Sequence, residues 1–186
     1  MDVRKTLAEL SDVAAAFFAA RAAAFDAALE TLAGSLKGGG KVLLFGNGGS
    51  AAEAQHFAAE LVNKFLRVRP AIAALALTTD TSCLTSLGND VSFDVVFSRQ
   101  VEALGRPGDV AVGLSTSGDS PNVIEGLQAA RRTGLRTFVL TGEGGGRAKP
   151  HADVLLDVPS RSTPRIQEVH LLVLHLLAEG LEERLA

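Results

Sequence analysis

Residues 41–50 read Lys-Val-Leu-Leu-Phe-Gly-Asn-Gly-Gly-Ser, and this stretch decides the fold. The apolar run from Lys41 to Phe45 is short and is followed by glycines, which is typical of a buried strand. The glycines then allow a sharp backbone turn at little steric cost. Ser50 and Glu53, three residues apart, match a capping box at the start of a helix. A strand, a glycine turn and a helix N-terminus together predict an anion site, with a plain tight turn as the alternative.

The anion is not a nucleotide held by a P-loop, because no Gly-Lys-Ser/Thr follows the glycines. The pattern Gly46-x-Gly48-x-x-Ala51 matches the loose form of the dinucleotide fingerprint, but this match is weak. A second loop, described below, argues against a dinucleotide.

The composition is that of one globular domain. The chain has 186 residues, 47% of them hydrophobic and 21% charged, with a net charge of −3. We see no basic cluster of the kind that nucleic-acid binding needs, no apolar run of membrane-spanning length and no signal-peptide pattern. The single Cys83 excludes an internal disulfide framework. We therefore expect a cytoplasmic protein that binds neither nucleic acid nor membrane.

A regular alternation of strands and helices follows residue 40 and predicts an α/β fold with a parallel sheet covered on both faces. The expected strands are 41–45, 73–77, 109–114, 136–141 and 153–158, and the expected helices are 50–65, 93–104, 121–133 and 164–185. Right-handed crossovers bring the carboxyl ends of all the strands to one edge, where ligands bind in such sheets. The chemistry should therefore lie in the segments that directly follow the strands.

The segment before residue 37 is expected to form two helices or one bent helix, ended by Gly38-Gly39-Gly40. Its apolar residues have helical spacing. They indicate either subunit packing or a cover for the chain's own sheet. We treat the core after residue 40 as complete without this segment, and so expect an oligomer.

Hydroxyl groups are concentrated after the third strand, where residues 115–120 read Ser-Thr-Ser-Gly-Asp-Ser. Pro121 follows, so Ser120 is expected to be the N-cap of the next helix. Backbone N–H groups, hydroxyls and a helix dipole can hold a phosphate without a cation. An uncharged, hydroxyl-rich pocket suits a small phosphorylated polyol better than a dinucleotide, and a plain capping turn is the alternative.

Two further groups of side chains are candidates for chemistry. His56 and Glu60 are four residues apart and share a helix face, which suits a metal site or acid–base catalysis, with an ordinary surface pair as the alternative. His175 lies among leucines in the last helix and needs a polar partner, so it is either a core histidine or a functional one. His151 and His170 are interpreted as structural or exposed.

Taken in order, these motifs are recognisable. They are Gly46-Asn47-Gly48-Gly49-Ser50, His56 and Glu60, Gly88-Asn89-Asp90, Ser115-Thr116-Ser117 with Ser120, and Arg165-Ile166-Gln167-Glu168 with His170 and His175. From about residue 40 to the end, the chain resembles the phosphoheptose isomerases, a branch of the sugar isomerase (SIS) domain family. The hydroxyl loop alone would indicate only an SIS domain, whereas His56, Glu60, Gln167 and His175 together are more specific.

The resemblance implies a flavodoxin-like sheet and a homotetramer with active sites at subunit interfaces. It implies that sedoheptulose 7-phosphate is converted to D-glycero-D-manno-heptose 7-phosphate for bacterial surface polysaccharide. It also implies one zinc per site, with ligands His56, Glu60, Gln167 and His175. Gln167 and His175 are eight residues apart, about 12 Å along a helix. They can share a metal only if both lean inward or if one comes from another subunit.

Roles follow from the same resemblance. Glu60 would be the base and His175 the acid in a proton transfer between C1 and C2. The polyol and phosphate would be bound by the two loops and their neighbours: Asn47, Gly48, Gly49, Ser50, Glu60, Asn89, Asp90, Ser115, Thr116, Ser117, Ser120 and Gln167. The rival function is that of relatives that bind a replication initiator and lack the acid and the histidine at the positions of Glu60 and His175. A sugar-phosphate-sensing regulator is a weaker alternative.

Overall fold

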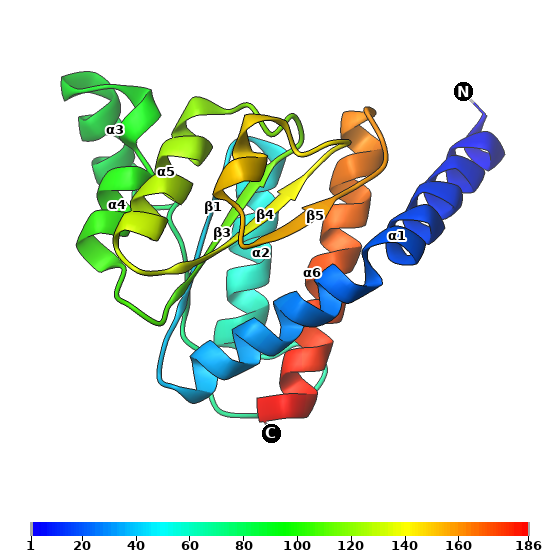
Figure 1. Cartoon of the computed structure of the whole chain (residues 1–186), viewed down its shortest axis with the longest axis horizontal. Coiled ribbons are helices and arrows are strands. Elements are labelled where there is room, and N and C mark those ends of the chain that lie inside the picture. The colour runs from blue at the N-terminus through cyan, green and yellow to red at the C-terminus, as the bar shows by residue number, and fades with distance from the viewer. Residues whose placement is uncertain (1, 186) are drawn as a thin grey trace.

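The computed structural model describes residues 2–185 and contains a five-stranded parallel sheet (Figure 1). The strands are β1 (Val42–Gly46), β2 (Ala74–Ala76), β3 (Val110–Ser115), β4 (Arg136–Thr141) and β5 (Val154–Asp157). Their order is β2-β1-β3-β4-β5, the flavodoxin-like order, and every neighbouring pair is parallel. The order in which strands are added to the sheet changes direction between β1 and β3, so the ligand crevice of this fold lies where these two strands end.

Six α-helices connect and cover the strands: α1 (Val3–Lys37), α2 (Gly49–Val62), α3 (Thr81–Asp90), α4 (Ser98–Leu104), α5 (Pro121–Arg132) and α6 (Thr163–Leu185). Two short 3₁₀ helices, η1 (Phe93–Val95) and η2 (Gly146–His151), complete the elements. No helix in the range 2–185 combines the length and apolar character needed to cross a membrane.

Two hydrophobic cores lie on the two faces of the sheet. On one face, Val42 and Leu44 of β1 pack with residues of α1, α2 and α6. On the other face, Leu43 and Phe45 pack with residues of α4 and α5. Successive side chains of β1 thus point to opposite faces of the sheet, as the two-residue period of a strand requires. Both faces are covered, which explains why β1 reads as a continuous apolar run.

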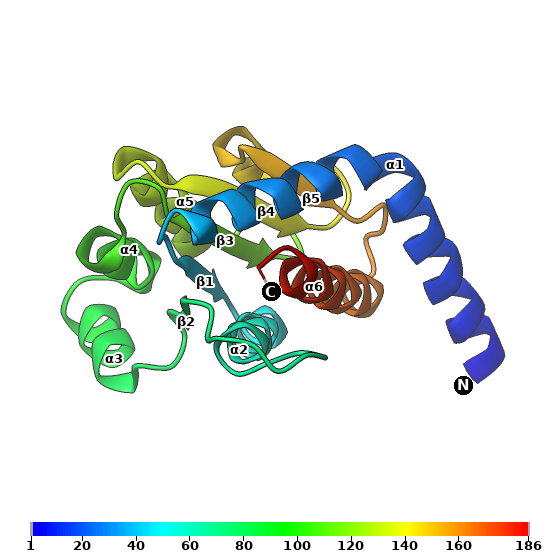
Figure 2. The same ribbon diagram turned by 90° about the horizontal axis from the view of Figure 1, so that it is seen from below.

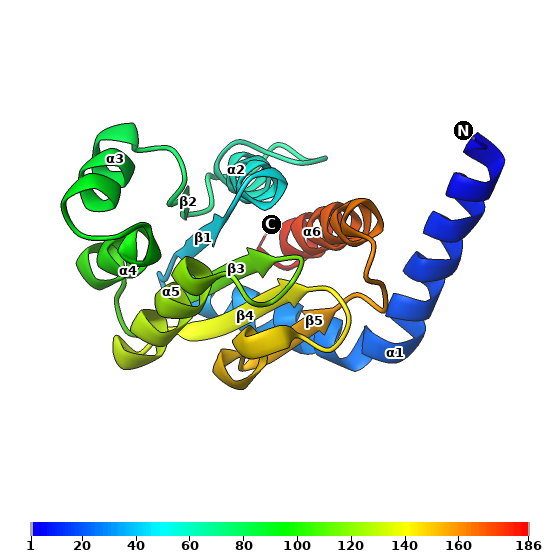
Figure 3. The same ribbon diagram turned by 90° about the horizontal axis from the view of Figure 1, so that it is seen from above.

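Val3–Lys37 form one bent helix, α1, which is one of the two expected alternatives (Figure 3). Its early part projects away from the rest of the domain, and Val3 and Leu7 are exposed (Figure 1). Its later part lies along the sheet and α6, as the view from below shows, and buries Phe17, Leu29 and Leu32 completely or almost so (Figure 2). The expectation that the core is complete without this segment is therefore wrong.

The close approach of α1 and α6 depends on a missing side chain. A Cβ atom built on Gly180 of α6 would lie 2.7 Å from a methyl carbon of Leu29 in α1. Glycine is unfavourable inside a helix by about 1 kcal/mol relative to alanine. Here that cost lets the first and last helices of the chain pack directly against each other.

All five predicted strands are confirmed to within a residue at each end, but the region between β2 and β3 was predicted less well. None of the expected helices covers residues 81–90, where the structure has α3, capped by the Asp80 carboxylate on the Cys83 N–H. Because Thr and Ser are weak helix formers, this helix has little signal in the sequence. The helix expected at 93–104 is broken into η1 and α4, and α2 ends at Val62 rather than Phe65.

Candidate active site

The glycine turn leads from β1 into α2, as predicted, but without the capping box. Gly48 is the N-cap with a φ of 55°, a left-handed conformation that favours glycine, and no side chain caps the helix. Ser50 is already the second helical residue and is buried. The capping-box prediction is wrong because the helix begins two residues earlier than the motif requires, at Gly49 instead of Ala51. The N-terminus of α2 is left open to the edge where β1 and β3 end.

A pair of amides fixes this turn. Asn47 donates its side-chain N–H to Oδ1 of Asn122, and Asn122 donates in return to Oδ1 of Asn47, both at 2.9 Å. Asn122 is buried in the first turn of α5. The pair therefore joins the N-terminal ends of α2 and α5. Sequence reasoning missed Asn122, because nothing in its local pattern distinguishes it from an ordinary helical residue.

The hydroxyl loop lies at the same edge and is organised by its own side chains. The hydroxyl of Ser115 is 3.0 Å from that of Ser120 and 3.4 Å from that of Ser117. Ser120 is the N-cap of α5 with Pro121 next to it, as predicted, but its side chain bonds to Ser115 instead of capping the helix. Hydroxyls and a helix N-terminus thus converge, which is an arrangement suited to a phosphate.

A cavity of about 210 Å³ opens beside this loop. Its lining combines the loop with the segments that follow β4 and β5: Thr116, Ser117, Glu143, Ser160, Arg161, Thr163 and Ile166. Arg161 is ion-paired with Glu143 at 2.6 Å, and both side chains are exposed. Arg161, the cation in this lining, comes from outside the two loops.

Gly118 gives the first prediction, because two features require glycine there. Its φ is +70°, and a Cβ atom would overlap the carbonyl oxygen of Gly145. Gly144 has a similar φ of +84° but open space around it. We expect Gly144→Ala to lose about 1–2 kcal/mol of unfolding free energy, the cost of left-handed backbone. Gly118→Ala should lose more and also weaken phosphate binding, as denaturant titration and phosphate titration would measure. Equal losses in the two variants would contradict the argument.

His56, Glu60 and His175 come together on the surface formed by α2 and α6. The Nε2 atoms of His56 and His175 are 2.8 Å apart, and Oε1 of Glu60 is 3.5 Å from Nε2 of His56. The ring of Phe65 stacks on His175 with centroids 5.2 Å apart. The sequence prediction that His56 and Glu60 share a face is confirmed, and His175 finds its polar partner in His56.

This trio is remote from the loops of its own chain. Because α2 starts at the carboxyl end of β1 and runs back, Glu60 lies about 16 Å along the helix from Gly49. The prediction that Glu60 binds the substrate together with the two loops therefore does not hold within one copy of the chain. Gln167 does lie at that edge, since a Cβ atom on Gly49 would overlap its side-chain amide. Within one copy of the chain, Gln167 therefore lies beside the glycine turn, whereas His175 lies against His56, away from that turn.

Asn89 and Asp90 occupy the end of α3. Both are exposed, and the Asn89 amide donates to the Asp90 carboxylate at 2.7 Å. α3 packs against η1, and its Leu84 lines a cavity together with Asn47 and Gly48 of the glycine turn. Their predicted contact with a polyol remains a prediction.

His170 is structural, one of the two predicted alternatives, and it is buried beside Glu53. Its Nε2 is 3.1 Å from the carbonyl oxygen of Thr141, so this nitrogen carries the hydrogen. Its Nδ1 is 3.8 Å from Oε2 of Glu53, and neither atom has a hydrogen-bond partner among the described residues. The pair joins α2, α6 and the end of β4 beneath the glycine turn.

The trio has a donor set that fits zinc. Two imidazoles and a carboxylate are the three protein ligands of one common class of catalytic zinc site. Within residues 2–185, however, no three His, Cys, Asp or Glu side chains are already spread around a common metal position. The two histidine nitrogens are instead at hydrogen-bond distance, so a metal would take the place of the hydrogen between them.

Comparison with known proteins identifies the class. Residues 7–142 match the family model described as SIS domain. A phosphoheptose isomerase from Desulfovibrio desulfuricans is 58% identical over 163 residues, covering 88% of this chain and 78% of the relative. One from Aromatoleum aromaticum is 57% identical over 166 residues, covering 88% and 84%. The chain therefore belongs to the SIS domain family and, within it, to the phosphoheptose isomerases.

The solved structures agree with this assignment. The phosphoheptose isomerase from Neisseria gonorrhoeae superposes with a TM-score of 0.91 at 45% identity and covers 97% of both chains. The one from Francisella tularensis superposes with a TM-score of 0.88 at 33% identity, covering 98% of this chain and 100% of that one. The bent first helix and the loops described above therefore belong to a fold that these enzymes share over nearly their whole length.

Proposed function

We propose that this protein converts sedoheptulose 7-phosphate to D-glycero-D-manno-heptose 7-phosphate, in the cytoplasm and as a step toward surface polysaccharide. The observation that carries the proposal is the contact of Glu60 and His175 with His56 in a member of the phosphoheptose isomerase family. A binding protein would need neither an acid nor a base at these positions. The binding-protein alternative is accordingly not favoured.

The phosphate would be anchored by the hydroxyl loop. The Ser115 hydroxyl already lies within hydrogen-bond distance of the hydroxyls of Ser117 and Ser120 at the start of α5. Thr116 lines the adjoining cavity. Gly48 and Gly49, at the start of α2, would bind the polyol or the phosphate through backbone N–H groups, with Ser50 beside them. The Ser50 N–H itself already donates to the carbonyl oxygen of Asn47 at 3.0 Å. Asn47, Asn89, Asp90 and Gln167 would orient the sugar hydroxyls.

The chemical step would be a proton transfer between C1 and C2 through an enediolate. The Glu60 carboxylate would take the proton from one carbon and return it to the other, and His175 would donate to the oxygens. His56, Glu60, His175 and Gln167 would hold one zinc, which would supply Lewis-acid polarisation of the carbonyl. Because Glu60 would serve as ligand and base, each role would belong to a different stage.

The distance between the two groups of residues supports a site built from more than one copy. Glu60 lies about 16 Å along α2 from Gly49, too far to act on a sugar bound at the glycine turn of the same chain. A second copy that presents its trio to these loops would complete the site. We therefore propose a homotetramer in which interfaces build the active sites.

Ser117 gives a prediction about the phosphate anchor. Its hydroxyl would contact the phosphate in the ground state and the transition state alike, so Ser117→Ala should raise KM more than it lowers kcat. Steady-state kinetics with sedoheptulose 7-phosphate measures both constants. A variant with unchanged KM and reduced kcat would contradict the assignment of Ser117 to the anchor.

The proposed function is tested directly with purified protein and sedoheptulose 7-phosphate. We expect formation of the aldose and exchange of the C1/C2 proton with solvent, measured by NMR in deuterated water. Absence of both with this substrate and with shorter ketose phosphates would overturn the proposal and favour a binding protein.

A further inference from the structure

A buried carboxylate in α6 organises the segment that follows α2. Glu182 is 1% exposed and accepts hydrogen bonds from the backbone N–H groups of Phe65 at 2.8 Å, Leu66 at 2.9 Å and Arg67 at 2.9 Å. Burial alone would raise the pKa of this carboxyl, but the three N–H groups and Arg69 outweigh it and hold the pKa below its ordinary value. Glu182 is therefore a fixed anchor for the chain at residues 65–67.

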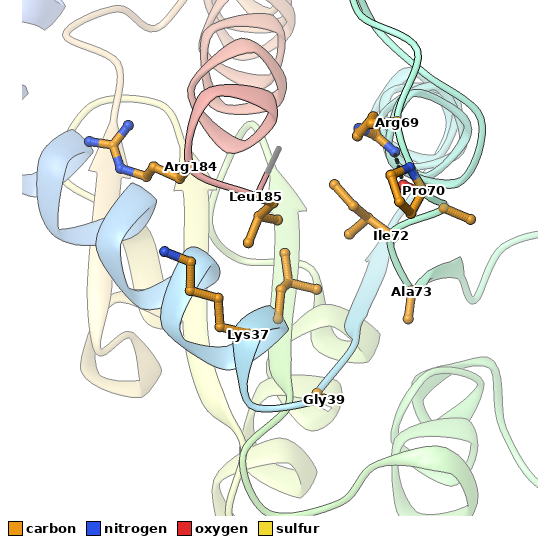
Figure 4. A pocket seen from close by; sticks show the side chains of 11 residues that line it. Lys37, Gly39, Arg69, Pro70, Ile72, Ala73, Arg184 and Leu185 are labelled. Atoms are coloured by element: carbon orange, nitrogen blue, oxygen red, sulfur yellow. Dashed lines mark hydrogen bonds between the residues drawn. The ribbon is translucent and has the colours of Figure 1, made fainter.

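The partner of this carboxylate is Arg69, which reaches back to the end of α2. Its side chain is 2% exposed, and its Nε lies 3.3 Å from Oε1 of Glu182. Its Nη2 donates to the carbonyl oxygen of Glu60 at 2.7 Å, and its Nη1 donates to that of Leu61 at 2.8 Å. Figure 4 shows a further bond from Arg69 to Pro70, beside a cavity of about 500 Å³. Arg69 thus caps the turn of α2 that carries Glu60.

The same pair also reaches His175. Phe65, whose N–H bonds to Glu182, stacks its ring on the His175 imidazole at an interplanar angle of 25°. Glu182 and His175 are seven residues apart on α6, two turns on the same side of the helix. The buried Arg69–Glu182 pair therefore contacts the backbone of Glu60, the proposed base. It also bonds to Phe65, whose ring packs on His175, the proposed acid.

We propose that Arg69 and Glu182 are positioning residues for the isomerisation, which set Glu60 and His175 relative to each other without touching the substrate. The inference rests on the proposed function of these two residues. A general base and acid act only when held in the productive geometry, and a displacement of about 1 Å can cost roughly 10²-fold in rate. The buried pair supplies that constraint at the C-terminal end of α2, where the helix would otherwise fray.

The test compares Arg69→Met and Glu182→Gln with a matched control. The control is Arg21→Met, which breaks the bidentate Arg21–Asp157 pair at 2.6 and 3.0 Å on another side of the domain. We expect the two variants of the pair to lose about 10²-fold in kcat with KM little changed. Arg21→Met should lower thermal stability but keep kcat. Glu182→Gln retains an acceptor oxygen and serves if Arg69→Met fails to fold.

A second measurement separates this inference from the proposed function. The ring resonances of His56 and His175 are recorded by NMR in each folded variant, and we expect them to shift in Arg69→Met or Glu182→Gln but not in Arg21→Met. If the wild type does not turn over sedoheptulose 7-phosphate, the proposed function fails and the resonances alone decide on the positioning role. Unchanged kcat in an active protein, unchanged resonances, or equal kcat losses in the control would overturn it.

Discussion

Glu60→Gln is expected to reduce the rate of isomerisation by about 10²–10⁴-fold, the usual loss when a general base is removed. The amide keeps the shape of the side chain and loses the proton acceptor. Affinity for the sugar phosphate should fall much less, because the hydroxyl loop and the glycine turn lie elsewhere in the fold. Turnover and C1/C2 proton exchange measure the first effect, and titration with substrate measures the second.

The control for this variant is its metal content, because an amide is also a poorer zinc ligand than a carboxylate. Zinc is therefore quantified in wild type and variant before the rates are compared. If a zinc-replete Glu60→Gln protein exchanges the C1/C2 proton at the wild-type rate, Glu60 is not the base. A loss of rate that tracks metal loss alone would assign Glu60 only the role of ligand.

Combining two damaged chains in one assembly should give more activity than either damaged protein has alone. One parent is Glu60→Gln, which lacks the base, and the other carries Ser117→Ala with Ser120→Ala, which damages the anchor. If the trio of one copy serves the loops of another, co-expressed chains form some sites with both parts intact. At substrate concentrations below the KM of the anchor variant, the mixture should then exceed both parents.

The alternative outcomes of this mixing experiment are clear. Sites contained within one chain would give a mixture whose activity is the average of its two parents. Light scattering on the same samples reports the assembly, and a stable monomer at micromolar concentration would contradict a site built between copies. Because α1 contributes to the chain's own core, its apolar residues no longer argue for the oligomer by themselves.

The strands could be predicted from the sequence because their residues are buried on both faces, which leaves an uninterrupted apolar run such as Val42–Phe45. Helix boundaries depended on weaker signals. The Ser50–Glu53 pattern has the right residues for a cap, yet the backbone of Gly48 turns the chain earlier. α3 was missed because its Thr and Ser residues favour turns as readily as helices.

The site could be predicted as a set of residues but not as an arrangement. His56 and Glu60 share a face by helical periodicity alone, whereas the contact with His175 depends on how α2 and α6 pack. Asn122 and Arg69 act through contacts with residues distant in the chain or with backbone carbonyls, and neither kind of contact leaves a local pattern. Residues of this kind become visible only in the folded structure.

The packing of α1 against α6 has a consequence for biosynthesis. Phe17, Leu29 and Leu32 are synthesised first, and part of the surface that buries them belongs to the final helix, which begins at Thr163. Chains are made from the N-terminus at about 5–20 residues per second, so the first helix waits for seconds with its apolar face uncovered. This domain therefore cannot complete its core until α6 has been synthesised, and until then the apolar face of α1 lacks part of its cover.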